Sequence, residues 1–442
     1  MSREEPGEPR RGAGEPGKPR TDTQEPGEPR TDTQEPGGSR TGAQEPGTGP
    51  WDSATLGEVS LVVTKGTTPT SIGRDFTASG TPFVKVESIR ASGVVDPDKV
   101  ARIDAETHEL LGRSALRADD VLFTIAGTIG RVALVPPSLV PGNTNQAVAV
   151  IRPDRRRVEP RFVLYCLREQ RRVRKAQSRV VQSVQANLSL GELRAVEIPL
   201  PPLAEQRAIA AVLGALDDRI AVDERIARTA GQLSAALFRQ ALLEHPDGFA
   251  ERPLSDTSEF VNGKPFTKGA TGTGRMVVRI AEMNSGPGAS TVHNDIEVDE
   301  KHLARPGDVL FAWSGSLTVM RWFRPEAIIN QHIFKCVPKN GNPRWLVSQL
   351  VHRKIDAFRA IAADKATTMG HIQRKHLDEP VAVPDPGTLR TLDGAIAPLW
   401  DRALLAERES LSLAVLRDTL LPQLLSGRLR VEEAEKIVGE RI

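Results

Sequence analysis

The sequence predicts an α+β protein in which two duplicated β-rich domains are separated by two long antiparallel helices that form a coiled-coil-like spacer. Three observations predict this fold: a segment repeats within the chain, short β-rich runs surround each copy, and a long helical apolar stripe follows each copy. The expected divisions are a tail over 1–50, β-rich domains over 51–202 and 246–386, and long helices over 203–245 and 387–442, the last with a C-terminal tail.

The first segment is a repeat of ten residues in which Glu-Pro-Gly recurs, beginning at Glu5, Glu15, Glu25, Glu35 and Glu45. Apolar side chains are nearly absent, so this segment cannot bury enough surface to offset the entropy lost on ordering. We expect a disordered tail that folding does not need; a start codon assigned too early in the gene is the alternative. The tail carries seven basic and ten acidic side chains, which leaves the rest of the chain at a net charge of +5.

The internal repeat is clearest where residues 117–127 match residues 305–315 at an offset of 188. Both copies contain Asp-Val-Leu-Phe after an arginine. An Asn-Gln pair at 145–146 matches a second pair at 330–331 at an offset of 185. The small change in offset indicates loops of different length, and two copies are too few for a solenoid. We therefore predict two homologous domains.

Each copy places its elements in the same order: short β-rich runs, a helix, a Pro-rich strap and a long helix. The first copy has runs at 82–86, 121–125 and 147–151, a helix over about 161–175 and a strap at 198–202; the second has a helix over about 344–361 and a strap at 383–386.

The two long helices are expected over about 203–243 and 389–425, where apolar residues recur at spacings of three and four. At about 1.5 Å per residue, each helix is a rod of roughly 55–60 Å. Two rods with one apolar stripe each can bury those stripes on each other, which predicts an antiparallel pair. The alternative is that each helix packs on its own domain.

Catalytic and metal-binding motifs are missing from the sequence. Cys166 and Cys336 have no metal-ligand spacing, and the Gly263-Lys264-Pro265 segment lacks the other residues of a phosphate-binding loop. We expect no catalytic, cofactor or metal site, which favours a binding protein; a nuclease acting alone is the enzyme alternative. Signal-peptide and membrane-spanning patterns are also missing, so we expect a cytoplasmic protein.

Two segments resemble a known family. Residues 198–209, Ile-Pro-Leu-Pro-Pro-Leu-Ala-Glu-Gln-Arg-Ala-Ile, resemble the strap-and-helix signature of specificity subunits of Type I restriction–modification systems. Residues 420–429, Leu-Leu-Pro-Gln-Leu-Leu-Ser-Gly-Arg-Leu, resemble the C-terminal signature of the same family. The resemblance covers about 51–431. The second strap departs from it, with Gly-Thr-Leu-Arg at 387–390 where the first has Leu-Ala-Glu-Gln at 203–206.

The resemblance implies that each β-rich domain is a target-recognition domain that reads one half of a bipartite double-stranded DNA site. It implies that the paired helices set the gap and dock two methyltransferase subunits, and that restriction/translocase subunits complete the complex. S-adenosylmethionine, ATP and Mg are then expected on the partners and not on this chain. The alternative is a two-domain DNA-binding regulator or architectural protein without methyltransferase partners.

Candidate DNA-binding residues lie in turns and in a basic segment. Base edges are read mainly by Arg, Lys, Asn and Gln, and loops on a β scaffold present such side chains. The turns at 65–69 and 262–265 differ in sequence, which predicts an asymmetric site, whereas the shared Asn-Gln pairs are expected to be scaffold. The basic segment 152–179 suits phosphate contacts, with a solvated helix face as the alternative. The candidates are Lys65, Thr67, Thr68, Lys85, Arg131, Arg171, Arg172, Arg174, Lys264, Thr267 and Lys268.

Overall fold

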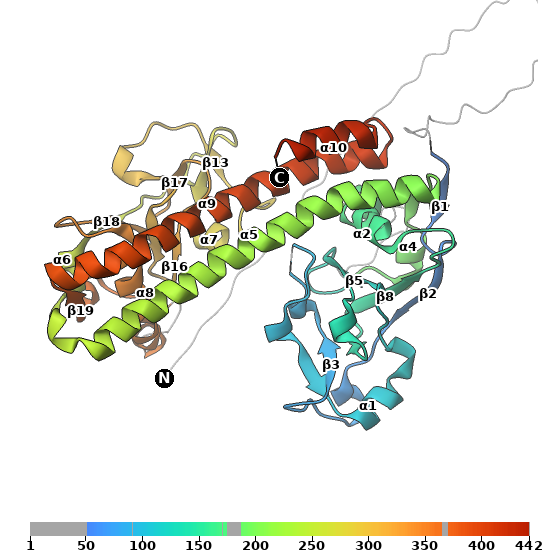
Figure 1. Cartoon of the computed structure of the whole chain (residues 1–442), viewed down its shortest axis with the longest axis horizontal. Helices are drawn as coiled ribbons and strands as arrows, with labels where there is room; N and C mark the ends of the chain where they lie inside the picture. Colours follow the sequence, from blue (N-terminus) through green and yellow to red (C-terminus); the bar gives the residue numbers. More distant parts are fainter. Residues whose placement is uncertain (1–50, 91, 170, 175–186, 365–369, 442) are drawn as a thin grey trace, which may run out of the picture. The chain divides into compact units, whose positions relative to one another are not determined.

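The computed structural model describes residues 51–441 except 91, 170, 175–186 and 365–369. The predicted tail over 1–50 lies outside the described residues. The described chain forms two similar β-rich domains and two long helices (Figure 1), which confirms the predicted fold class. The division at residues 202, 245 and 386 stays a prediction.

The first β-rich domain contains three small sheets. An antiparallel sheet has the order β2-β8-β5-β6, and a second sheet has the order β4-β3-β7, with β3 and β7 parallel. A third sheet joins the two ends of the domain through the antiparallel pair β1-β9. The strands are β1 (Ser53–Thr55), β2 (Ser60–Lys65), β3 (Thr81–Val84), β4 (Ala101–Ile103), β5 (Val121–Thr124), β6 (Val132–Leu134), β7 (Asn143–Thr144), β8 (Val148–Pro153) and β9 (Glu197–Pro199).

The second domain repeats this topology with one additional strand, β14, which pairs with β17. Its sheets have the orders β11-β18-β15-β16, β13-β12-β17-β14 and β10-β19. Val121 lies opposite Ile151 in the first domain, and Val309 lies opposite Cys336 in the second, so the register is also repeated. The strands are β10 (Phe249–Pro253), β11 (Ser258–Asn262), β12 (Arg275–Val278), β13 (His293–Asn294), β14 (Leu303–Ala304), β15 (Val309–Ala312), β16 (Thr318–Arg321), β17 (Ala327–Ile329), β18 (Ile333–Pro338) and β19 (Pro380–Pro384).

The helices of the two domains differ in length. The helix predicted over 161–175 is shorter: α2 (Pro160–Arg168) ends where Glu169 leaves helical geometry at ψ 85°. Residues 171–174 are helical again, and residue 175 lies outside the described residues. The matching α8 (Arg344–Asp364) is continuous. The other helices of the domains are α1 (Ala105–Leu110), α4 (Leu190–Arg194), α6 (Leu254–Thr257) and α7 (Ile280–Ser285).

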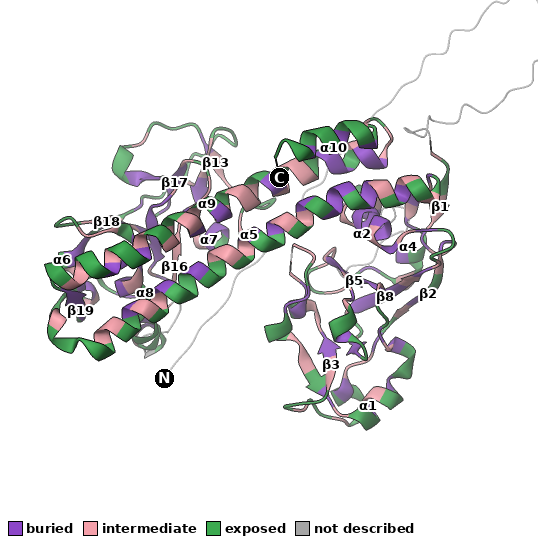
Figure 2. Ribbon diagram, viewed as in Figure 1, coloured by how far each residue is buried: buried purple, intermediate pink, exposed green. Residues whose placement is uncertain are grey.

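The two long helices, α5 (Leu203–Glu244) and α9 (Pro386–Leu425), pack along each other in antiparallel directions (Figure 1). The direction follows from two ion pairs, Asp217 with Arg417 and Asp223 with Arg402. Most of the predicted stripe is buried (Figure 2), but Leu233 is 46% exposed.

Each end of the helix pair also belongs to the core of one domain. One cluster joins the first domain to α5 as far as Ile220 and to α9 from Leu413 onward. Another joins the second domain to Phe238 of α5 and to the first turns of α9. The two long helices therefore pack on each other and also on the domains, so both of the predicted packing modes are present. No helix in the described part of the chain has an apolar stretch long enough to cross a bilayer.

The sequence did not predict a helix after α9. The chain turns at Gly427 and forms α10 (Val431–Gly439), which buries Val431, Ala434 and Val438 in the cluster of the first domain. The C-terminal segment therefore packs on the helix pair as a third helix.

Candidate nucleic-acid interface

The candidate turn of the first domain is held against the Asn-Gln pair. Gly66 follows the last residue of β2, and a Cβ atom there would lie 1.6 Å from the Thr144 carbonyl oxygen. The Thr68 amide and hydroxyl both donate to Gln146 Oε1, at 3.2 and 2.5 Å. The Gln146 side chain therefore has the scaffold role that the sequence predicts; in the same turn Lys65 is exposed and Thr67 is half-buried.

The second domain builds its turn in the same way. A Cβ atom on Gly263 would lie 2.2 Å from the Asn330 carbonyl oxygen, and Lys264 forms a parallel bridge with Asn330. Lys264 and Lys268 are exposed and Thr267 is half-buried. The two turns thus share a backbone path, while their side chains differ.

Two other candidates are already engaged within the first domain. The Lys85 ammonium pairs with Glu87 at 2.7 Å and lies over the Phe76 ring. The Arg131 guanidinium is half-buried and donates to the Ile89 carbonyl at 2.7 Å. These contacts favour a scaffold role for Arg131, because a DNA contact would have to replace a hydrogen bond that a buried carbonyl needs.

In its described part, the basic segment largely contacts other residues of the protein. Arg152 forms a bidentate pair with buried Asp120, while Arg161 and Arg168 pair with carboxylates of α5. Of the three predicted phosphate contacts, Arg172 pairs with Glu169 at 2.5 Å, and Arg171 and Arg174 are exposed. Charge density in the sequence therefore overstates the basic surface that the described residues of this segment offer to DNA.

Sequence analysis missed two basic residues beside the candidate turns. The 3₁₀-helix η4 (Gly112–Ser114) contacts β2 and β7, and the Nη2 atom of exposed Arg113 lies 3.4 Å from the Lys65 carbonyl oxygen. In the second domain, η7 (Glu300–His302) contacts β11 and carries exposed Lys301. The offset of 188 that aligns the copies also aligns these two residues.

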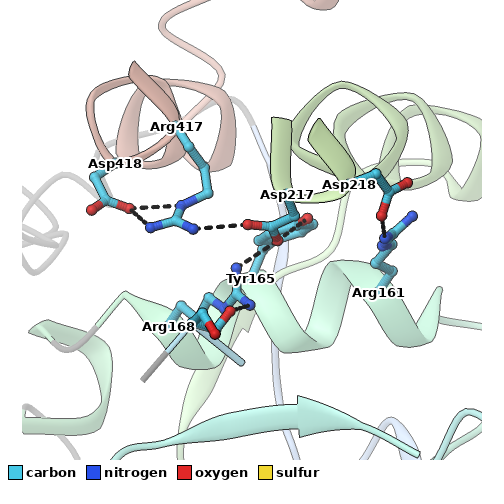
Figure 3. A network of polar contacts seen from close by, with 8 residues as sticks. Arg161, Tyr165, Arg168, Asp217, Asp218, Arg417 and Asp418 are labelled. Atoms are coloured by element: carbon cyan, nitrogen blue, oxygen red, sulfur yellow. Dashed lines mark hydrogen bonds and ion pairs between the residues drawn. The ribbon is translucent and has the colours of Figure 1, made fainter. Parts of the chain in front are cut away.

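The first domain is fastened to both long helices through one carboxylate (Figure 3). Asp217 of α5 accepts hydrogen bonds from Tyr165 at 2.8 Å, Arg168 at 2.6 Å and Arg417 of α9 at 2.8 Å. Burial raises the pKa of Asp217, but the two guanidinium groups and the Tyr165 hydroxyl outweigh burial and hold this pKa below its ordinary value. The network fixes the domain on the helix pair.

Different hydrogen bonds hold the first turns of the two long helices. Gln206 is buried at the start of α5; its amide donates to the carbonyls of Pro201 and Arg157, and its oxygen accepts from the Glu159 amide at 3.0 Å. At the start of α9, the Asp385 carboxylate instead caps the first turn through the amides of Gly387 and Thr388. The departure of the second strap from the first therefore has a structural basis.

Among the described residues, no three His, Cys, Asp or Glu side chains gather in a way that could hold a metal ion. Cys166 and Cys336 are both buried thiols, and burial raises the pKa of each.

Comparison with known proteins gives a consistent result. A family profile described as the Type I restriction modification DNA specificity domain matches residues 49–229. A putative type I restriction enzyme MjaX specificity subunit from Methanocaldococcus jannaschii is 26% identical over 207 residues, 44% of this chain and 47% of the relative. The type I restriction enzyme EcoBI specificity subunit of Escherichia coli is 31% identical over 134 residues, 29% of this chain and 27% of the relative.

The match with M. jannaschii spans about half the length of that relative. The fold is similar over a longer span to a crystal structure of a Type-I restriction-modification system S subunit from M. genitalium. That structure has a TM-score of 0.51 and 19% identity, with 86% of this chain and 97% of the other covered.

Proposed function

We propose that this chain, which belongs to the Type I restriction–modification specificity-subunit family, selects the DNA sequence on which its complex acts. In this proposal each β-rich domain is a target-recognition domain that reads one half of a bipartite double-stranded DNA site. The observation that carries the proposal is the duplicated turn, which keeps one backbone path in both domains but presents different side chains.

The difference between the turns supports an asymmetric site. Lys65 and Thr67 of the first domain correspond to Asn262 and Lys264 of the second. A lysine and an asparagine present different hydrogen-bonding groups to a base pair, so equivalent positions would favour different bases. The two halves of the site would then have different sequences.

The helix pair supports a role as the spacer. Each domain shares a core with one end of α5 and α9, so the length of helix between the two attachment points would set the gap between the half-sites. Methyltransferase subunits would dock on this frame and bring S-adenosylmethionine, and restriction subunits would bring ATP and Mg. The chain itself would be non-catalytic and would act in the cytoplasm.

The test is to express the chain with the methyltransferase of its host and to map methylated bases by sequencing. We expect the two proteins to co-purify and to methylate one bipartite sequence with two unlike halves. A chain that binds DNA tightly but neither co-purifies with nor directs a methyltransferase would instead be a regulator or architectural protein. Magnesium-dependent cleavage by the chain alone would contradict the non-catalytic role.

A further inference from the structure

Each β-rich domain carries a basic residue at the same place beside its candidate turn. Arg113 lies at the centre of η4 and Lys301 at the centre of η7, and both short helices precede the Asp-Val-Leu-Phe strand by the same interval. Both helices also contact the strand that ends in the turn, β2 in one domain and β11 in the other. The two residues are therefore equivalent in the fold.

The neighbours of these two residues have diverged. Gly112 and Ser114 flank Arg113, whereas Glu300 and His302 flank Lys301. Ser114 and His302 are both buried and belong to the interior of their own domains. The position that faces solvent has kept a positive charge, although the positions on either side of it have changed in size, polarity and charge.

Neither of the two basic side chains makes a strong polar contact with the described residues of the protein. The Arg113 side chain has only the long 3.4 Å contact with a backbone carbonyl, and it forms no ion pair with any described residue. Lys301 lies 3.6 Å from Asp299, but both side chains are about 60% exposed, where such pairs contribute little. Other exposed arginines on these domains, such as Arg155 and Arg305, are matched by carboxylates.

Each turn therefore has two cations beside it. Arg113 reaches toward Lys65 in the first domain. In the second, η7 carries exposed Lys301 and contacts β11, the strand that leads into the turn with exposed Lys264. A pair of exposed cations next to a turn is suited to bind the phosphates that flank the bases the turn reads.

We propose that Arg113 and Lys301 are equivalent phosphate-binding residues, which hold the DNA backbone against the two domains in the same orientation while the turns read different bases. This inference rests on the proposed function. It separates the two tasks of each domain: the position shared by both copies orients the duplex, and the position that differs selects the sequence.

The test compares charge-removing and charge-keeping variants of the full chain in complex with its co-purified methyltransferase. The variants are Arg113→Gln, Lys301→Gln and their combination, with Arg113→Lys and Lys301→Arg to keep the charge. The matched control is Arg239→Gln on the exposed face of α5. Binding is measured over a range of salt concentrations, to a duplex with the mapped methylation site and to a mixed-sequence duplex of equal length.

We expect each Gln variant to weaken binding to both duplexes by a similar factor, roughly three- to tenfold, and to reduce the slope of log Kd against log salt by about 1. In the double variant the two factors should multiply. The charge-keeping variants and the control should bind both duplexes as tightly as the parent. The methylated sequence should not change, and an unchanged melting temperature would show that the variants are folded.

Three results would overturn the inference. Gln variants that bind like the parent would show that the residues face away from DNA, and an equal loss in the control would show an effect of net charge alone. A changed half-sequence in a Gln variant would make that residue a base contact. Failure of the parent complex to bind the mapped duplex would instead count against the proposed function.

Discussion

Asp217 of α5 accepts a hydrogen bond from Arg417 of α9 at 2.8 Å, although 200 positions separate the two residues in the chain. The same carboxylate accepts hydrogen bonds from Arg168 and Tyr165 of α2. One side chain therefore joins the first β-rich domain to both long helices. The three side chains that carry charge are each about 13–16% exposed, so none can exchange its partner for bulk water at little cost.

Replacing Asp217 by Asn should lower the free energy of unfolding by about 2–4 kcal/mol, because Arg168 and Arg417 would keep their charges without a carboxylate. The control is Asp218→Asn: Asp218 pairs with Arg161, but the Asp218 side chain is 67% exposed, so its loss should cost less than about 1 kcal/mol. Urea unfolding of both variants at neutral pH measures the difference. Equal losses in the two variants would show that the buried network around Asp217 contributes no more to stability than the exposed pair of Asp218 with Arg161.

Replacing Gly66 by Ala should disrupt the first turn, because the added methyl group would lie 1.6 Å from a backbone oxygen that the strand β7 holds in place. We expect a loss of more than about 3 kcal/mol, and Gly263→Ala should have the same kind of effect in the second domain. Gly231→Ala is the control, since nothing lies within 4 Å of its Cβ position and the exposed helix should gain about 0.5–1 kcal/mol. Thermal unfolding of the three variants would test this; a stable Gly66 variant would mean that the turn can move away from β7.

Lengthening the spacer should lengthen the gap between half-sites, provided that both helices are extended together. Between the ion pairs Arg219–Glu409 and Asp223–Arg402, neither domain core includes both helices. Four residues inserted after Ala221 in α5 and four after Arg408 in α9 therefore leave the two partners of each ion pair on the same side of the insertions. Four residues add about 6 Å and nearly preserve helical phase. At about 3.4 Å per base pair, we expect the same two half-sequences with a gap about two base pairs longer.

Methylation mapping checks the spacer prediction. The control is the α5 insertion alone, which should lower stability because α9 no longer matches its length. If the double insertion changes the half-sequences and leaves the gap fixed, the helices do not set the spacing.

The second domain should lose stability as the pH falls below about 6.5. Burial, with Lys264 and Lys301, holds the pKa of His302 below its ordinary value of 6.5, so the unfolded chain takes up a proton at this site before the folded domain does. The contribution is fully present above pH 6.5 and is lost at up to about 1.4 kcal/mol per pH unit below it. His302→Leu should reduce this pH dependence, whereas His245→Gln, at an exposed position, should leave it unchanged. Urea unfolding as a function of pH measures the slopes; equal slopes in the parent and His302→Leu would contradict the prediction.

The arrangement of elements could be predicted from sequence because the signals are local. The repeated Asp-Val-Leu-Phe segment fixes equivalent strands, and the spacing of three and four along α5 and α9 fixes helices with one apolar face. The end of α2 at Arg168 could not be predicted, because residues 161–175 contain no glycine or proline that would mark it.

The candidate site was harder to predict from the sequence, because residues far away in the chain decide whether a charged side chain is paired within the protein. Arg161 and Arg168 count as basic surface in the sequence, yet their partners lie some 50 positions later on α5. Arg113 carries no motif of its own. It becomes a candidate only when the fold sets η4 beside β2 and the second copy shows Lys301 in the same place.

The cluster that joins the first domain to the helix pair includes Leu56 near the start of the described chain and Val438 near its end. During translation the residues of the first domain leave the ribosome long before α10 is made, so the cluster around α5 is completed only after α9 and α10 have been synthesised. Contacts this distant in sequence form slowly, because a large loop must close first. A nascent chain therefore exposes the face of α5 that α9 and α10 later cover, and a ribosome that stops before codon 413 releases a product in which much of that face stays uncovered.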